Sequence, residues 1–160
     1  MCIRDRSDGS PITANDWEFT FDTVKSLSLG GNFLSSYPYS CEDEEGTAKN
    51  CVVSVVASDD YTVSITFNYD PGLSTWQYGT AQGIAFSKAY WEQYATDKET
   101  LYAHDATNAP VASAFVYDKL EQGAFYTWKY DANTMWYGGT TTIYDGGGTS
   151  VDWDNGKAPA

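Results

Sequence analysis

Residues 7–27 read SDGSPITANDWEFTFDTVKSL and hold the clearest helix start in the chain. Thr13 stands where an N-cap residue is expected, and Asp16 follows at the spacing of a capping box. Three apolar residues then recur at the spacing of one helical face: Trp17, Phe21 and Val24. Because a Gly-Gly pair follows at residues 30–31, the stretch predicts a helix from about Ala14 to Leu27.

Downstream of this helix, alternation of apolar and polar residues predicts strands. Residues 52–57 and 61–67 form the two halves of a predicted hairpin, with Ser58–Asp60 as its turn. Residues 109–120 and 123–131 predict a second strand pair, and residues 140–144 predict a short strand in a Gly-rich tail. Together with the opening helix, these strands indicate a mixed α+β fold.

The remaining segments carry weaker signals. A second helix is predicted from about Lys88 to Tyr94. Residues 32–50 are expected to form a loop, and the polar residues 97–108 a loop with at most one helical turn.

Composition excludes several classes of protein. The 160-residue chain has a formal net charge of −13, so it repels phosphate backbones and is not expected to bind nucleic acid. No stretch approaches eighteen consecutive apolar residues, so no membrane span is predicted. Aromatic residues make up 16% of the chain, which suits either ordinary sheet packing or a binding cleft.

Both ends of the chain look atypical. Residues 1–6, MCIRDR, show no periodicity and resemble a translated sequencing adapter, so we treat them as a non-native leader. The last residues, GKAPA, follow no terminating element. We therefore expect the chain to be an internal fragment of a longer protein.

The cysteines indicate a disulfide rather than a metal site. Cys41 and Cys51 flank a polar loop that contains a glycine, and such a pair can close a small ring in an oxidising compartment. Free cysteines are the alternative. A metal site would need more nitrogen or sulfur ligands, and the single histidine, His104, is far away in sequence.

No catalytic constellation stands out. Residues 152–157, DWDNGK, depart from the spacing of a calcium loop because Gly156 comes one position early. His104 has no G-x-S-x-G partner motif anywhere in the chain. Paired carboxylates of a glycosidase remain open because acidic residues are abundant. We expect no enzyme activity, no metal and no cofactor.

The order of four segments resembles the dipeptide/oligopeptide-type solute-binding proteins of ABC importers. Residues 7–27 resemble that family's DG-x-P-(L/V)-T-A-x-D motif. Residues 55–70, VVASDDYTVSITFNYD, resemble its hairpin. Residues 84–94, IAFSKAYWEQY, resemble its P-K helix start, although Ser87 replaces the usual proline. Residues 108–139 resemble its P-V-G-S-G-P-Y strand pair, with the glycines and the proline replaced in ASAF.

The resemblance implies a two-lobed, hinged receptor like other periplasmic binding proteins. In it, residues 7–80 would belong to the small lobe, residues 81–139 would cross into the large lobe, and residues 140–160 would be a truncated tail. Closure of the lobes would capture a peptide or similar small solute and deliver it to ABC permease subunits in the membrane. The protein would be periplasmic or extracellular, with lipid anchoring as one option.

The resemblance also implies which residues face the solute. Four lie between the hairpin and the second helix: Trp76, Tyr78, Gln82 and Gly83. A second group is the counterpart of the family's G-P-Y turn: Ser113, Phe115 and Tyr117. For Trp76 and Tyr117, ordinary core packing is the competing interpretation.

Two other classes of protein stay open. A secreted carbohydrate-binding or adhesion module would explain the acidic, aromatic composition, but it predicts a β-sandwich without the opening helix. A glycosidase fragment predicts two inward-facing carboxylates at neighbouring strand ends. The helix and the order of the segments favour the receptor over both.

Overall fold

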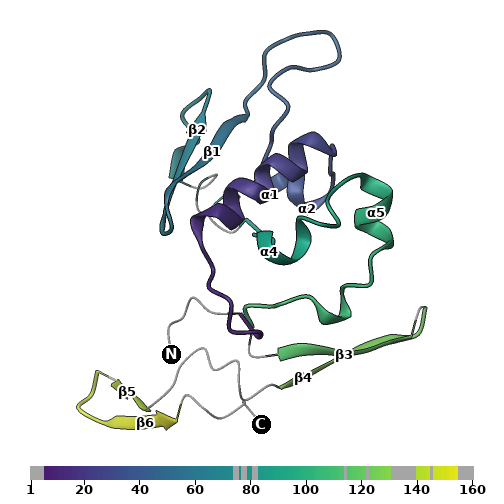
Figure 1. Ribbon diagram of the computed structural model, residues 1–160. Coiled ribbons are helices and arrows are strands. Elements are labelled where there is room, and N and C mark those ends of the chain that lie inside the picture. The colour runs from purple at the N-terminus through teal and green to yellow at the C-terminus, as the bar shows by residue number, and fades with distance from the viewer. Residues whose placement is uncertain are drawn as a thin grey trace. The chain divides into compact units, whose positions relative to one another are not determined.

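The computed structural model describes residues 6–73, 76, 79–80, 83–113, 115–121, 123–130, 140–144 and 146–154. Helices and strands are mixed along this part of the chain, as the sequence predicted (Figure 1). The chain divides into two compact units. The helical unit comprises residues Thr13–His104, and the hairpin unit comprises residues 1–12 together with 105–160. Within the described ranges, no helix is long and apolar enough to cross a membrane.

The predicted opening helix is confirmed as α1 (Ala14–Ser26). Its first turn is closed by a capping box: Asp16 Oδ2 accepts a hydrogen bond from the Thr13 backbone N–H at 2.8 Å. The Asp16 backbone N–H in turn donates to the Thr13 carbonyl at 3.0 Å. These contacts satisfy amides that a helix start otherwise leaves without partners.

Two apolar clusters place α1 at the centre of the helical unit. On one side Phe21 packs with residues of β1 and with Tyr37, whose ring meets the Phe21 ring edge-on at 6.2 Å. On the other side Val24 packs with Leu29 and Leu101. Full burial of side chains of this size stabilises a fold by about 1.5–3 kcal/mol each. Both apolar clusters of this unit therefore include a buried residue of α1.

The first predicted hairpin is confirmed as β1 (Val52–Asp59) paired antiparallel with β2 (Thr62–Phe67). Its turn lies at residues 60–61 and not at the predicted residues 58–60, because β1 continues through Asp59. Asp59 Oδ1 accepts a hydrogen bond from the Tyr61 backbone N–H at 2.8 Å, which closes the turn and lowers the pKa of Asp59.

Two segments expected to be loops contain helices. Residues 32–36 form α2 (Asn32–Ser36). In the segment 97–108, α5 (Lys98–Ala103) and the 3-10 helix η2 (Ala106–Asn108) replace most of the expected loop. Asp97 caps α5 by accepting a hydrogen bond from the Thr100 backbone N–H at 2.8 Å, which also lowers the pKa of Asp97. The second predicted helix is shorter than expected, since α4 (Lys88–Trp91) gives way to turns after Trp91.

The hairpin unit contains two antiparallel strand pairs. β3 (Phe115–Glu121) pairs with β4 (Phe125–Tyr130), so the strand predicted from residue 109 begins six residues later. β5 (Thr140–Tyr144) pairs with β6 (Ser150–Asp154), a strand that the sequence did not predict. Each of the three sheets formed by the described residues has only two strands.

Candidate functional site

The first segment expected to face a solute, residues 76–83, lies in the helical unit. Trp76 exposes 41% of its surface, so it is not part of the core. Tyr78 and Gln82 lie outside the described residues. Gly83 is partly buried and begins a stretch without helix or strand, residues 83–87, that leads into α4.

Gly83 has a structural reason to be glycine. A Cβ atom at this position would lie 2.6 Å from the Tyr37 hydroxyl oxygen, 2.8 Å from Tyr37 Cζ and 3.0 Å from the Thr80 carbonyl oxygen. These separations are well below van der Waals contact. The close approach of the backbone to the Tyr37 ring therefore excludes a side chain, whether or not a solute also lies nearby.

Tyr37 is fully buried beneath this stretch. Its hydroxyl donates a hydrogen bond to the Ile84 carbonyl at 3.3 Å. Burial disfavours the charged phenolate and raises the pKa of Tyr37 to about 12. The ring and its hydroxyl together hold the start of the stretch against the core.

Two polar residues of α1 fix the rest of the stretch. Thr20, with no exposed surface, accepts a hydrogen bond through Oγ1 from the Phe86 backbone N–H at 2.7 Å. Asp16, 5% exposed, accepts one through Oδ1 from the Lys88 backbone N–H at 2.8 Å. Both contacts are made to the backbone and join residues more than sixty positions apart in sequence.

This role of α1 is not predicted from the sequence. Asp16 is expected there only as part of the capping box, and Thr20 has no expected role. One signal was available: Asp16 and Thr20 are four residues apart, so they lie on the same face of the helix. Buried polar side chains require hydrogen-bond partners, but the spacing does not reveal which distant amides supply them.

The second segment expected to face a solute lies in the hairpin unit. Ser113 Oγ accepts a hydrogen bond from the Phe115 backbone N–H at 3.2 Å. Phe115 is exposed, and its ring meets that of Tyr130 edge-on at 6.1 Å. Tyr117 meets Trp128 in the same way at 5.9 Å. The structure thus brings Ser113, Phe115 and Tyr117 together in one hairpin.

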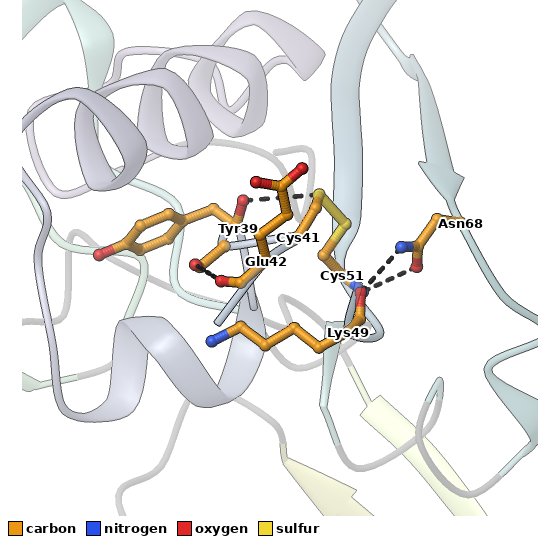
Figure 2. Close-up of a disulfide and its surroundings, with 7 residues drawn as sticks. Tyr39, Cys41, Glu42, Lys49, Cys51 and Asn68 are labelled. Atoms are coloured by element: carbon orange, nitrogen blue, oxygen red, sulfur yellow. Dashed lines mark hydrogen bonds between the residues drawn. A yellow bond between two sulfur atoms is a disulfide. The ribbon is translucent and has the colours of Figure 1, made fainter. Parts of the chain in front are cut away.

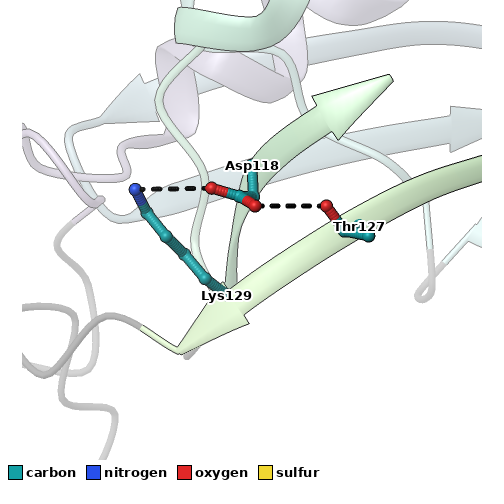
Figure 3. A network of polar contacts seen from close by, with 3 residues as sticks. All are labelled: Asp118, Thr127 and Lys129. Carbon is teal, nitrogen blue, oxygen red and sulfur yellow. Dashed lines mark hydrogen bonds and ion pairs between the residues drawn. The ribbon is translucent and has the colours of Figure 1, made fainter. Parts of the chain in front are cut away.

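The register of this hairpin separates an aromatic face from a polar one. Three cross-strand pairs place large apolar side chains opposite one another: Phe115 with Tyr130, Tyr117 with Trp128, and Leu120 with Tyr126. A register shift between Tyr117 and Lys119 places Leu120 opposite Tyr126. On the other face Asp118 accepts a hydrogen bond from Thr127 Oγ1 at 3.2 Å and forms an ion pair with Lys129 at 3.8 Å (Figure 3).

An open groove of about 730 Å³ lies along β3, with η2 contributing to its wall. Its lining includes Tyr117 as well as charged side chains such as Asp105 and Lys119. The Tyr117 hydroxyl is buried and has no hydrogen-bond partner among the described residues. Burial and the nearby Asp105 carboxylate raise the pKa of Tyr117.

Cys41 and Cys51 form a disulfide that closes an exposed acidic loop (Figure 2). Asn68, which follows β2, ties the base of this loop to the hairpin. Its side chain accepts a hydrogen bond from the Cys51 backbone N–H at 2.9 Å and donates one to the Lys49 carbonyl at 2.8 Å. In the described part of the chain, no group of three or more His, Cys, Asp or Glu residues is arranged to hold a metal ion.

Comparison with known proteins decides the family. Residues 7–152 match the family model described as bacterial extracellular solute-binding proteins, family 5 Middle. The chain belongs to this family. No match was found among curated proteins or among solved structures.

Membership in family 5 agrees with the resemblance found in the sequence. Its members are extracellular or periplasmic solute-binding proteins of ABC import and not enzymes. The match includes α1 and the stretch that Asp16 and Thr20 fix, as well as the β3–β4 hairpin. Both segments expected to face a solute therefore lie within the matched range.

Proposed function

We propose that this family 5 chain captures a peptide or similar small solute by closure of two lobes and delivers it to the membrane subunits of an ABC importer. The observation that carries the proposal is the family match over residues 7–152. The exposed Trp76, close in sequence to the fixed stretch 83–87, supports it. An exposed aromatic side chain suits a cleft that binds through apolar area.

Capture of this kind needs no covalent chemistry. A solute that binds the closed form more tightly than the open form shifts the equilibrium between them. The side chains expected to supply contact area are Trp76 in the helical unit and Phe115 and Tyr117 in the hairpin unit. The solute class and the permease partner are part of the proposal.

A thermal-shift screen of the chain with defined dipeptides, tripeptides and longer peptides tests the solute class, and neutral saccharides form a second arm. A bound peptide at about 100-fold its Kd adds about 2.7 kcal/mol to the free energy of unfolding, or roughly 5–10 °C in Tm. A response to saccharides alone would favour the carbohydrate-binding alternative. A chain that responds to neither arm would contradict the proposal.

Two matched variants locate the binding surface. Trp76→Ala removes an exposed aromatic side chain that we expect to face the solute, and it should weaken binding of the responding peptide about tenfold or more. Tyr102→Ala removes another exposed aromatic side chain, 60% exposed on α5, and it should leave Kd unchanged. Equal effects of both variants would remove Trp76 from the site.

A further inference from the structure

The disulfide between Cys41 and Cys51 reaches from the surface of the helical unit into its core. Cys51 has no exposed surface, and neither does Val52, which follows it as the first residue of β1. Cys41, ten positions earlier in the chain, is only partly buried. The disulfide therefore joins a segment near the surface to the start of a core strand.

That segment, residues 37–41, forms neither helix nor strand, and two backbone hydrogen bonds attach it to the start of β1 and the residues just before it. The Val52 N–H donates to the Pro38 carbonyl at 2.7 Å. The Lys49 N–H donates to the Cys41 carbonyl at 2.9 Å. The disulfide adds a covalent link to these two contacts and so limits how far the segment can separate from the strand (Figure 2).

Tyr37, the first residue of this segment, extends the attachment to the segment expected to face the solute. Its hydroxyl oxygen would lie 2.6 Å from a Cβ atom at Gly83, and its hydroxyl donates to the Ile84 carbonyl at 3.3 Å. The Gly83 N–H in turn donates to the Thr80 carbonyl at 3.0 Å. A shift of the Tyr37 ring would therefore loosen the backbone at residues 83–84.

We propose that the Cys41–Cys51 disulfide is a redox-sensitive clamp on Tyr37. In the disulfide form, the clamp holds residues 37–41 against the start of β1 and keeps the Tyr37 ring beneath the segment expected to face the solute. In the dithiol form, only the two backbone hydrogen bonds remain, so opening of residues 37–41 costs less free energy. The consequence for solute binding rests on the proposed function.

Reduction of the clamp requires a dithiol, such as the dithiol form of a thiol oxidoreductase, and proceeds by two exchange steps. Because Cys51 is fully buried, the dithiol attacks Cys41 Sγ as a thiolate, forms a mixed disulfide and releases Cys51 as a thiolate that takes up a proton. The second thiol of the dithiol loses its proton and attacks the mixed disulfide. The reductant leaves as its own disulfide, and Cys41 takes up the second proton.

Amide hydrogen exchange, followed by NMR before and after reduction with dithiothreitol, tests the clamp. Both samples carry Cys2→Ala, so that the third cysteine cannot exchange with the pair. The amides of Val52 and Gly83 report the clamped segment and the backbone above Tyr37. The amide of Leu29, which belongs to the other apolar cluster, is the internal control. Counting free thiols confirms that reduction is complete.

We expect reduction to raise exchange at Val52 and Gly83 roughly tenfold, which corresponds to the weakening of one buried hydrogen bond at each amide. Exchange at Leu29 should stay unchanged. Unchanged exchange at Gly83 in the fully reduced chain would overturn the proposal. Equal increases at all three amides would also overturn it, because the disulfide would then stabilise the whole unit and not the position of Tyr37.

A reciprocal experiment keeps the test available if the reduced chain fails to fold. Gly83→Ala pushes on the Tyr37 ring from the opposite side, and coupling between two sites is reciprocal. In mixtures of reduced and oxidised dithiothreitol, this variant should therefore shift the equilibrium severalfold towards the dithiol form. Leu101→Val is the matched control, since it removes one buried methylene group from the other apolar cluster and should leave the equilibrium unchanged.

Equal shifts for the two variants, or no shift for Gly83→Ala, would overturn the proposal. Neither experiment contains a solute, so a negative result leaves the thermal-shift test of solute binding unaffected.

Discussion

The two units of this chain bury their side chains very differently. Every buried hydrophobic residue among those described belongs to the helical unit: Ala14, Phe21, Val24, Leu29, Tyr37, Cys51, Val52, Val55 and Leu101. In the hairpin unit, Leu120, Tyr126 and Trp128 are more than half exposed, and the Tyr117 hydroxyl is buried without a partner among the described residues. Isolated two-stranded hairpins are marginally stable in water. The helical unit therefore has a hydrophobic core that packs against α1, whereas β3 and β4 expose aromatic side chains.

The largest expected effect is a loss of stability on truncation of a buried aromatic ring, compared with an exposed one. Phe21→Ala removes a ring that is 2% exposed, so it should lower the free energy of unfolding of the helical unit by about 3–5 kcal/mol. Tyr126→Ala removes a ring that is 67% exposed and should change it by less than about 0.5 kcal/mol. Urea unfolding followed by circular dichroism measures both. Similar losses for the two variants would contradict the division.

The next effect depends on pH. Tyr37 has an ordinary pKa of 10.0 in the unfolded chain and about 12 in the folded chain. The unfolded chain therefore releases this proton first as pH rises. The stability from the neutral hydroxyl is fully present below pH 10 and is lost between pH 10 and about pH 12, by about 2–3 kcal/mol. Urea unfolding at pH 9 and pH 12 measures the change, and Tyr37→Phe should remove this part of it. An equally steep loss in Y37F would assign it to other tyrosines.

A smaller effect tests the contact between Gly83 and Tyr37. Gly83→Ala should destabilise the helical unit by about 1–3 kcal/mol, because the new methyl group overlaps a buried ring that cannot move aside. Gly30→Ala is the matched control, since a Cβ atom there meets nothing within 4 Å. Thermal unfolding of both variants gives the difference. A neutral G83A would show that the segment is not packed on Tyr37 as described.

The smallest effect is a stabilisation. Ser87 has φ −66°, which proline adopts without strain, and its backbone N–H donates no hydrogen bond to another described residue. Ser87→Pro places the residue that family members usually carry there. It should raise the free energy of unfolding by about 0.4–1 kcal/mol by restricting the unfolded chain. Ser87→Ala controls for loss of the hydroxyl. A destabilised S87P would show that the stretch before α4 differs from this geometry.

Local signals made part of the fold predictable. The capping box of Thr13 and Asp16 and the spacing of the apolar residues gave the bounds of α1 almost to the residue. Alternation gave the β1–β2 hairpin, but its turn was placed too early because Asp59 suits a turn as well as a strand end. The Asp97 cap of α5 was also visible in the sequence, yet no apolar periodicity followed it, and the helix was missed.

The site was less predictable because its contacts are distant in sequence. The hydrogen bonds that Asp16 accepts from the Lys88 N–H and Thr20 accepts from the Phe86 N–H depend on tertiary packing, which no local pattern encodes. The resemblance selected Gly83, but only the position of Tyr37 explains why it is glycine. The solute-facing roles of Trp76, Ser113, Phe115 and Tyr117 remain predictions, as do those of Tyr78 and Gln82.

Hydrogen exchange with and without a peptide that responds in the thermal-shift screen tests the central claim most directly. If both units take part in capture, the bound peptide should slow amide exchange at residues 76–83 of the helical unit and at residues 113–117 of the hairpin unit together. The acidic loop between Cys41 and Cys51 should be unaffected and serves as the internal reference. Protection confined to one unit, or spread evenly over the chain, would contradict the account.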